Sequence, residues 1–257
     1  MNVLVIGAHP DDCEYRVAGT AVKLVRAGCR VKFLNMTNGD AGHHELTGPK
    51  LAARRAKESG EACRRLGVTE IETLDVHDGE LMPTIELRRA VIRRIRAWGA
   101  DVVITHRPND YHPDHRYTSQ LVADAAFMVT VPAACPESPA LRVNPVFLYM
   151  EDEFTKPSPF SPDLVVPIDD VWDLKVAAID AHESQFYEWL PWLDGETEQV
   201  PLDRAARREW LSQKLTRPLA PQVRALAGPS VERAEAFELC EYGRRLSRDE
   251  LSKLFAI

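Results

Sequence analysis

The first half of the chain alternates short, continuous apolar runs with longer segments in which apolar residues recur every three or four positions. Continuous runs bounded by turn residues indicate buried strands, whereas the longer spacing indicates helices that are apolar on one face. The pattern predicts strands over residues 2–9, 30–37, 71–76, 101–106, 146–150 and 164–168. It predicts helices over residues 17–28, 48–66, 84–98, 113–128 and 169–185.

This alternation of strands and helices predicts the fold class. Parallel neighbours must be joined by crossover connections, so strands that alternate with helices indicate a parallel sheet. We therefore expect an α/β fold with a doubly wound, mostly parallel sheet and helices on both faces, similar to a Rossmann fold. Residues 186–228 show a weak pattern. We expect a single domain, with an α/β core over residues 1–185 and an irregular C-terminal extension over 186–257 that packs on the core.

The composition limits the class of protein further. The 257 residues are 45% hydrophobic and 28% charged, which is typical of a globular chain long enough for one full core. The formal net charge of −7 argues against nucleic acid as the main partner, and arginine pairs such as Arg64-Arg65 fall on polar helix faces. No apolar run approaches the roughly 18–20 residues that a membrane helix needs.

Two features bear on the cellular compartment. Met1 leads within two residues into the first apolar run, without the basic and apolar segments of an export signal. The five cysteines are odd in number and scattered, which disfavours a disulfide framework and matches no zinc-knuckle spacing. We therefore expect a cytoplasmic protein with reduced thiols, and a homo-oligomer stays an open alternative to a monomer.

Polar residues that suit catalysis follow the predicted strands. They lie in loops over residues 9–14, 38–44, 77–80 and 106–115. Ligands of doubly wound sheets bind outside the carboxyl ends of the strands. We therefore expect these four loops to gather at one edge of the sheet, which would bring acids and histidines from distant parts of the chain together.

The loop after the first predicted strand reads GAHPDDCEY and holds His9, Asp11 and Asp12. A turn at this point needs only Gly, Pro and one Asp, so the imidazole and the second carboxylate need another explanation. Taken singly, His9 is an ordinary loop residue and Asp12 is a helix N-cap. Adjacent residues on an extended loop point apart, so one carboxylate can bind a cation while the other stays free to act as a base.

The loop after the fourth predicted strand ends in His112-Pro113-Asp114-His115. Proline is favoured at the first helical position, which puts His112 at the N-cap and His115 in the first turn, on the same face. Asp114 alone would only favour the helix dipole. Two imidazoles aimed at the loop of His9 suit a zinc site with three protein ligands and a position open for water. The spacing does not tell which histidine binds metal and which acts in catalysis.

These segments resemble the PIG-L/LmbE-like N-acetylglucosaminyl deacetylase family, and the resemblance runs from residue 2 to about residue 185. The motifs that carry it are AHPDD at residues 8–12, Glu14 after it, Arg55 and Glu58 ahead of the helix end Leu66-Gly67, HPDH at residues 112–115, and His-x-Ser-Gln at residues 182–185. The two hallmarks, AHPDD and HPDH, are specific in combination, and either alone is less so.

The resemblance implies roles for the residues nearest the chemistry. His9, Asp12 and His115 would hold a zinc ion. Asp11 would be the general base, taking a proton from the water that attacks the amide and later passing it to the leaving amine. Zinc would lower the pKa of that water toward about 7 and polarise the carbonyl group.

Four further residues take roles from the same resemblance. His112 would stabilise the oxyanion or pass a proton, and as a cation it would face the developing negative charge. Asp114 would orient His112 and favour its protonated form. Arg55 and Asp78 match positions that contact the sugar in related enzymes.

The resemblance therefore implies a zinc-dependent hydrolase, with one Zn²⁺ per chain, that removes the N-acetyl group from an N-acetylglucosamine-type sugar or glycoconjugate. The alternatives are a zinc amidase for another small acylated amine or sugar-thiol conjugate, and a non-catalytic sugar- or nucleotide-binding module. A dinucleotide-binding module should show G-x-G-x-x-G after the first strand, where this chain has GAHPDD. We expect a small-molecule amino-sugar partner, and neither nucleic acid nor membrane.

Three features stay open at this level. Arg16 stands where the family often has glycine, and it would pair with Glu14, point to solvent or contact an anionic substrate. The aromatic residues within 186–192 either stack on a sugar or are buried against the sheet or a subunit partner. His43-His44 indicates a flexible substrate loop rather than a second metal site.

Overall fold

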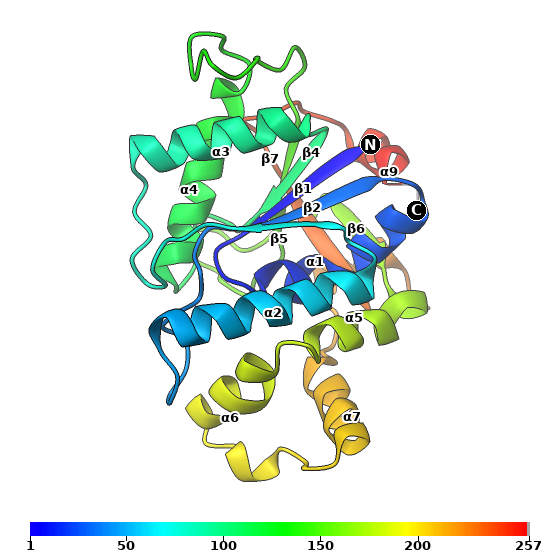
Figure 1. Ribbon diagram of the computed structural model, residues 1–257. Helices are drawn as coiled ribbons and strands as arrows, with labels where there is room; N and C mark the ends of the chain where they lie inside the picture. The colour runs from blue at the N-terminus through cyan, green and yellow to red at the C-terminus, as the bar shows by residue number, and fades with distance from the viewer. Residues whose placement is uncertain (256–257) are drawn as a thin grey trace.

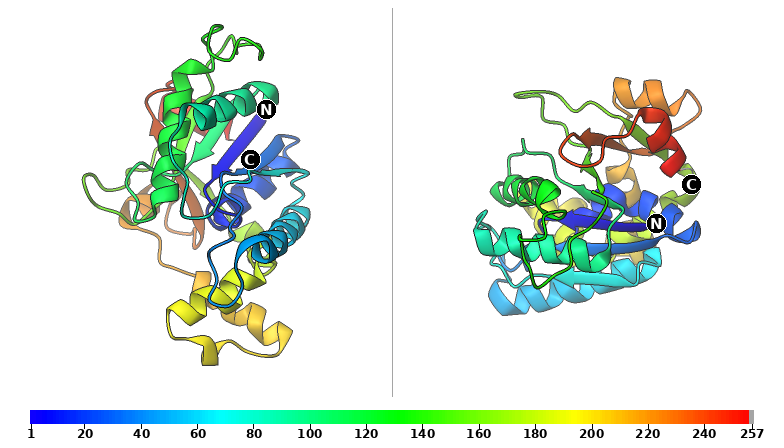
Figure 2. Two further views of the ribbon diagram at one scale, coloured as in Figure 1. Left: turned by 60° about the vertical axis from the view of Figure 1, so that its left-hand side comes forward. Right: turned by 90° about the horizontal axis from the view of Figure 1, so that it is seen from above.

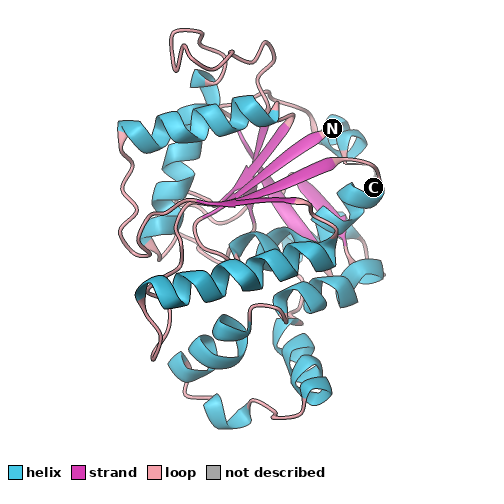
Figure 3. Ribbon diagram, in the orientation of Figure 1, coloured by secondary structure: helices cyan, strands magenta, loops and turns pink. Residues whose placement is uncertain are grey.

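The computed structural model of the protein describes residues 1–255. It contains one seven-stranded sheet in the order β3-β2-β1-β4-β5-β7-β6 (Figures 1 and 3). The strands are β1 (Asn2–Gly7), β2 (Arg30–Asn35), β3 (Glu70–Thr73), β4 (Val102–Thr105), β5 (Val146–Met150), β6 (Leu164–Pro167) and β7 (Ala234–Cys240). The pairs from β3 to β5 are parallel, whereas β7 is antiparallel to both β5 and β6. The prediction of a doubly wound, mostly parallel sheet is confirmed.

Helices surround this sheet. They are α1 (Asp12–Arg26), α2 (Gly48–Leu66), α3 (Ile85–Trp98), α4 (Pro113–Met128), α5 (Trp172–Ile179), α6 (Leu190–Leu193), α7 (Arg204–Leu215), α8 (Pro221–Ala227) and α9 (Arg248–Leu254). Three further helical segments are η1 (Asp169–Val171), the π-helical η2 (Ser184–Trp189) and η3 (Thr197–Gln199). Helices α6 and α7 project from the end of the molecule beyond α2 and α5 (Figure 2). Within residues 1–255, no helix combines the length and apolar character that crossing a membrane requires.

The continuous apolar run of β1 is explained by burial on both faces. Val3 and Val5 pack in the core beneath α1, α2 and α5, while Leu4 and Ile6 pack in the core beneath α3 and α4. All four side chains are fully buried. Alternate residues of a strand point to opposite faces, so a strand covered on both sides needs apolar residues at every position.

Local capping chemistry fixes several helix ends where the sequence predicted them. The helices over 48–66 and 113–128 have the expected bounds. The Thr84 side chain accepts a hydrogen bond from the Leu87 N–H at 3.2 Å and caps α3. Gly67 ends α2 with φ = 76°, a left-handed conformation that glycine adopts without a side-chain clash.

The start of α1 differs from the prediction. The strand ends at Gly7 instead of residue 9, and the helix begins at Asp12 instead of residue 17. The reason is the backbone of Asp11, whose φ of 150° turns the chain sharply out of the sheet. A non-glycine residue held there costs of order 1–3 kcal/mol, and such strain concentrates at functional sites.

The second half of the chain is more ordered than its sequence pattern indicates. The predicted helix over 169–185 is divided into η1, α5 and the start of η2, and the weakly patterned 186–228 segment contains α7 and α8. Residues 234–240 form a strand that the sequence did not predict, because its Glu235 is an acid at a buried position. Glu235 is neutralised there by Lys175 at 2.6 Å. The division at residue 185 stays a prediction, but the later segment supplies part of the sheet.

Two helical glycines differ in how much room they have for a side chain. A Cβ at Gly19 in α1 would lie 2.5 Å from Ile168 Cγ2, whereas a Cβ at Gly60 in α2 would meet no atom within 4 Å. We expect Gly19→Ala to lower the free energy of unfolding by about 1–3 kcal/mol through overpacking. The matched change Gly60→Ala should raise it by about 0.5–1 kcal/mol, because alanine favours helix. Urea denaturation measures both, and a Gly19→Ala protein as stable as the wild type would contradict the close packing.

Candidate active site

Loops from four strands meet at the carboxyl-terminal edge of the sheet. The strand order reverses between β1 and β4, which is where doubly wound sheets bind ligands. Backbone hydrogen bonds join the loops: Thr37 N–H donates to Ala8 O at 2.8 Å, and Asn38 N–H donates to Val76 O at 2.9 Å. The predicted gathering of distant loops at one edge is therefore confirmed.

His9, Asp12 and His115 converge on one point at this edge. His9 Nδ1 lies 3.3 Å from His115 Nε2 and 3.4 Å from Asp12 Oδ2, and His115 Nε2 lies 3.5 Å from Asp12 Oδ1. Ligand atoms bound to tetrahedral zinc at about 2.0–2.1 Å lie about 3.3–3.4 Å from one another. The spacing and chemistry of these three donors therefore fit a zinc ion, with a fourth position left for a ligand from outside the protein.

Buried carboxylates hold the outer nitrogens of both imidazoles. His9 Nε2 lies 3.2 Å from Asp114 Oδ2 and 3.1 Å from Asp78 Oδ1. On the other side, His115 Nδ1 lies 3.1 Å from Asp110 Oδ2. A proton shared with a carboxylate at one ring nitrogen leaves the lone pair of the other nitrogen facing the cation. Sequence reasoning gave Asp110 no role, although it lies in the same loop as the HPDH motif.

Besides His9, Asp12 and His115, three overlapping groups within residues 1–255 have the spacing to hold a cation, and the hydrogen bonding of His106 argues against one of them. The groups are His9 with His112 and His115, Asp12 with His106 and His115, and His9 with Asp78 and Asp114. His106 Nε2 already accepts the Ala8 N–H at 3.0 Å, which occupies the lone pair a metal would need. Burial and the neighbouring His115 also lower the pKa of His106. His106 thus acts as a neutral acceptor that holds the first loop, a long-range contact that the sequence alone does not reveal.

The expected contact between Asp114 and His112 takes a different form. Two backbone amides donate to the Asp114 carboxylate, Gly79 N–H at 2.7 Å and Leu81 N–H at 3.2 Å, and the same carboxylate holds His9. Instead, the backbone N–H of Asp114 donates to His112 Nδ1 at 3.2 Å. The Asp114 side chain therefore contacts the loops that follow β1 and β3, while its backbone N–H caps α4 through His112.

Asp114 therefore orients a predicted metal ligand through its side chain. We expect Asp114→Asn to weaken metal affinity about 10–100-fold, because outer partners of ligating histidines have effects of this size. Metal titration followed by competition with a chelator measures the change. Asp124→Asn, on the exposed face of the same helix, is the matched control. Unchanged affinity in Asp114→Asn would mean that the contact with His9 does not support the metal.

Asp11 points away from the cluster that its neighbour Asp12 joins. Its Oδ1 lies 3.2 Å from Arg55 Nη2, and burial raises the pKa of Asp11 to about 6 against the opposing effect of Arg55. Burial would also raise the pKa of Asp12, but His115 and His9 outweigh it and hold that pKa well below its usual range. Two adjacent carboxylates are thus given different protonation behaviour by their surroundings.

His112 is not electrostatically suited to carry a positive charge in the metal-free protein. Burial and the neighbouring His9 and His115 lower the pKa of His112, and Asp114 and Asp78 oppose this effect only in part. Asp114 favours the protonated form of His112, as expected, but burial and the two neighbouring histidines outweigh it. Because Nδ1 of His112 accepts a backbone hydrogen bond, its remaining nitrogen, Nε2, carries the proton of the neutral ring.

Arg55 and Asp78 are enclosed by the protein. Arg55 is 2% exposed and donates to Gly39 O at 3.2 Å and Pro10 O at 3.0 Å, besides its contact with Asp11. Asp78 is 9% exposed and faces His9 and Arg55. The close approach requires glycine at position 39, where a Cβ would lie 2.7 Å from Arg55 Nη1. A role of these two residues in sugar binding stays a prediction.

The His-x-Ser-Gln motif holds α2 and the loop after β2. The Ser184 hydroxyl donates to Glu58 Oε2 at 2.6 Å, and Gln185 Nε2 donates to Gly42 O at 3.1 Å. His182, fully buried, lies 3.5 Å from Glu14 Oε1. Glu14 is therefore directed inward to His182, and the expected pairing of Arg16 with Glu14 is wrong.

The loop at residues 38–47 is anchored to η2 and α6. His43 Nε2 lies 2.9 Å from Glu188 Oε2, and the His44 ring stacks on Trp192 with centroids 5.0 Å apart. Arg54 also binds Glu188. These contacts hold the loop in place, which the sequence pattern of a flexible loop does not show.

An open cavity of about 490 Å³ lies beside the cluster, lined at this end by Asp11, Asp12 and His115. Its other end is lined by residues of the projecting α6 and α7. The apolar side chains of its far wall are Phe186, Leu190, Pro191, Trp210, Leu211 and Leu215. Its volume lies in the range of about 300–1,000 Å³ that is usual for small-molecule sites.

Comparisons with known proteins agree with this geometry. Residues 4–126 match the family described as PIG-L, GlcNAc-PI de-N-acetylase. The diacetylchitobiose deacetylase of Thermococcus kodakarensis is 33% identical over 202 residues, which cover 75% of this chain and 74% of that protein. A Bacillus anthracis protein named "Probable N-acetyl-alpha-D-glucosaminyl L-malate deacetylase 2" is 28% identical over 228 residues, 83% of this chain and 92% of that protein.

A solved structure extends the likeness to the fold. The N,N'-diacetylchitobiose deacetylase from Pyrococcus horikoshii, complexed with an inhibitor, superposes with a TM-score of 0.73 at 27% identity and covers 94% of this chain and 84% of that chain. The matched family segment contains AHPDD and HPDH, and the first of these relatives matches three quarters of the chain. The chain belongs to the PIG-L family.

Proposed function

We propose that the protein is a zinc-dependent N-deacetylase that removes the acetyl group from an N-acetylglucosamine-type sugar or glycoconjugate. The observation that carries the proposal is the convergence of His9, Asp12 and His115 at zinc-compatible distances beside an open cavity. The relatives named as deacetylases of diacetylchitobiose and of N-acetylglucosaminyl malate support the substrate class.

Asp11 is the general base in this proposal. When bound, zinc would lower the pKa of water and polarise the amide carbonyl. Asp11 lines the cavity next to the ligands and is held at 3.2 Å by Arg55, so its free oxygen can take a proton from the attacking water. The same carboxyl group then returns this proton to the amine as the C–N bond breaks.

His112 is the proposed oxyanion donor. Its Nδ1 accepts the Asp114 N–H, which leaves a proton on Nε2. A neutral imidazole can donate that hydrogen bond to the oxygen that gains negative charge as water adds to the carbonyl. The lowered pKa of His112 agrees with this neutral donor role and not with a role as a permanent cation.

Release of acetate from N-acetylated amino sugars tests the function. Zinc-loaded protein is incubated with N-acetylglucosamine, its glycosides and N-acetylated non-sugar amines, and acetate and primary amine are measured together. We expect the two products in equal amounts from the sugars. Turnover of another amide without any sugar turnover would favour the alternative zinc amidase. No turnover of any compound by protein with bound zinc would support a non-catalytic binding module and overturn the proposal.

A further inference from the structure

Two residues of the family motifs have no part in the proposed chemistry. Glu14 follows AHPDD on α1, and His182 opens the His-x-Ser-Gln segment after α5. Glu14 is 1% exposed and His182 is 0% exposed. Arg16 and Glu151 line the open cavity, whereas neither Glu14 nor His182 lines it. Two polar side chains that are closed off from the cavity must serve groups of the protein and not the substrate.

Both side chains belong to a buried polar layer where the neighbouring helices α1, α2 and α5 meet (Figure 1). Its members, each no more than 2% exposed, are Glu14, Arg55, Ser59, Cys63 and His182. The three members from α2 lie one turn apart on the same face of that helix. Cys63 Sγ donates to Glu14 Oε1 at 3.8 Å, and His182 Nε2 lies 3.5 Å from the same oxygen. The layer therefore ties the three helices together through polar groups.

The proposed base borders this polar layer. Asp11 stands one turn before Glu14 at the start of α1 and lies 3.2 Å from Arg55, while it also lines the cavity. Burial lowers the pKa of His182, but Glu14 and then Asp11 outweigh burial and raise the pKa overall. The charges therefore alternate from the base inward, with Arg55 and a protonated His182 on either side of Glu14.

Several polar atoms of the layer have no hydrogen-bond partner among the described residues. They are Glu14 Oε2, both ring nitrogens of His182, Arg55 Nε and Ser59 Oγ. Buried polar groups in folded proteins are almost always satisfied, and internal water, which typically makes about three hydrogen bonds, serves where protein groups do not. N–H donors, a carboxylate acceptor and a hydroxyl that does both are the partners that such a water needs.

We propose that Glu14 and His182 are positioning residues for the general base, and that internal water held between them, Ser59 and Arg55 completes their support. The polar layer fixes the Arg55 guanidinium, and Arg55 holds the Asp11 carboxylate in the orientation that accepts a proton from the attacking water. Glu14 and His182 act through these groups and do not touch the substrate. The inference rests on the proposed deacetylase function, because it assigns the support of the base in that reaction.

Steady-state kinetics of acetate release tests the positioning. Glu14→Gln keeps the shape of the side chain and removes its charge. We expect it to lower kcat about 10–100-fold while KM and zinc affinity stay within about twofold, because a slightly misplaced base costs rate and not binding. Ser59→Ala removes only one hydroxyl from the layer and should lower kcat about two- to tenfold. This second variant carries the test if Glu14→Gln impairs folding.

A double-substitution cycle separates positioning from a purely structural role. If Glu14 acts through Asp11, adding Glu14→Gln to Asp11→Asn should leave the residual kcat within about twofold, because the base that Glu14 positions is already absent. A structural defect would instead lower the rate by the same factor in both backgrounds. Equal losses in the two backgrounds, or an unchanged kcat in Glu14→Gln alone, would overturn the inference.

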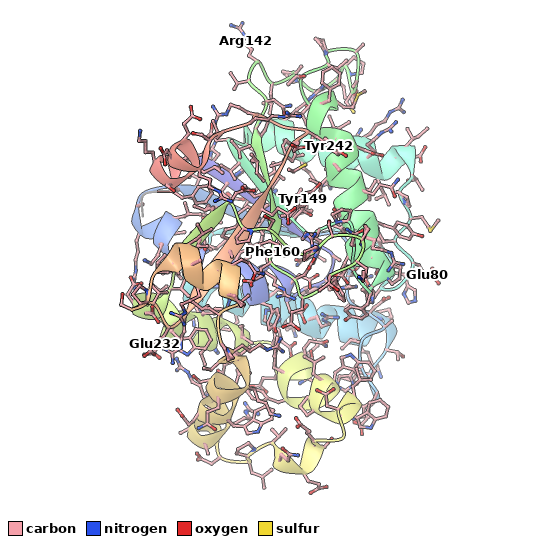
Figure 4. All side chains as sticks on the ribbon, turned by 180° about the vertical axis from the view of Figure 1, so that it is seen from behind. Glu80, Arg142, Tyr149, Phe160, Glu232 and Tyr242 are labelled. Atoms are coloured by element: carbon pink, nitrogen blue, oxygen red, sulfur yellow. The ribbon has the colours of Figure 1, made fainter. Side chains whose placement is uncertain are left out.

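Two control variants carry the same chemical change at other glutamates. Glu58→Gln alters a buried carboxylate on α2 whose partners, Arg54 and Ser184, lie outside the polar layer. Glu232→Gln alters an exposed carboxylate at the outer edge of the molecule (Figure 4). Both should keep kcat within about twofold of wild type. A loss in Glu58→Gln as large as that in Glu14→Gln would overturn the specific role of Glu14.

Crystal structures of the zinc-loaded proteins separate this inference from the proposed function. In wild type we expect an ordered water in the polar layer and Asp11 in contact with Arg55, and in Glu14→Gln we expect Asp11 to be displaced. A wild-type layer without water would overturn the water-mediated support. Displacement of Asp11 in Glu14→Gln, with no acetate release by wild type, would overturn the deacetylase function and leave the positioning standing. Acetate release by wild type, with Asp11 unmoved in Glu14→Gln, would overturn the positioning and leave the function standing.

Discussion

Replacing Asp11 by asparagine is expected to lower kcat about 10²–10⁴-fold, the usual contribution of a general base. The amide has nearly the shape of the carboxylate but cannot take a proton from water. Asparagine tolerates positive φ better than most residues, so the backbone at φ = 150° should be retained. Zinc content and thermal stability should therefore stay near wild type. Acetate release kinetics together with metal analysis measure the effect.

The control for this change is Asp75→Asn, because Asp75 lies on an exposed loop at the same edge of the sheet, and its side chain hydrogen-bonds only to Asn38 within residues 1–255. Burial raises the pKa of Asp11 to about 6 in the metal-free protein, and a bound cation would lower it. The base must be ionised, so kcat/KM should fall with decreasing pH through a pKa of about 6 or below. An acidic limb well above pH 6, or full activity of Asp11→Asn, would contradict the assignment.

Replacing His115 by alanine is expected to abolish zinc binding. The several kcal/mol of transition-state stabilisation that a metal supplies would be lost with it, so kcat should fall about 10²–10³-fold or more. Binding to the folded state alone also stabilises a protein. Zinc at about 1,000 times its Kd should therefore raise the free energy of unfolding of the wild type by about 4 kcal/mol. The His115→Ala variant should show no such increase. Metal analysis and thermal unfolding with and without zinc measure both effects.

His44→Ala is the matched control, since His44 stacks on Trp192 away from the cluster. It should keep bound zinc and the zinc-dependent stabilisation. Stoichiometric zinc in His115→Ala would show that the cation is held by a different group of residues, and the proposed ligand set would then be wrong.

Sequence patterns predicted the sheet well because a doubly wound fold requires a distinct pattern of apolar residues along the chain. A strand such as β1, with Val3 and Leu4 buried on opposite faces, must be continuously apolar. Gly67 ends α2 because glycine adopts the left-handed conformation freely, and Pro113 begins α4 because its fixed φ suits the first helical position. The convergence of the loops then followed from the topology of parallel strands.

Contacts between loops and the strand β7 could not be predicted in the same way. The Asp114 carboxylate contacts His9, whereas the Asp114 N–H contacts His112. Which group contacts which histidine depends on the orientation of the first turn of α4, and the sequence is the same in either case. From the sequence alone, Glu235 is predicted to be a surface acid, because its contact with Lys175, sixty positions earlier, is not apparent there. Two opposite charges that neutralise each other from such distant positions in the sequence leave no periodic pattern in it.

The position of β7 has a consequence for how the protein is made. This strand lies between β5 and β6, although it is the last to be synthesised. Before residue 240 has left the ribosome, β6 has no neighbour to pair with and β5 has an open edge. Glu151, whose N–H donates to Ala236 O at 3.2 Å, would also lack its anchor. The half of the cavity beside α6 and α7 can therefore be completed only after β7 has been translated.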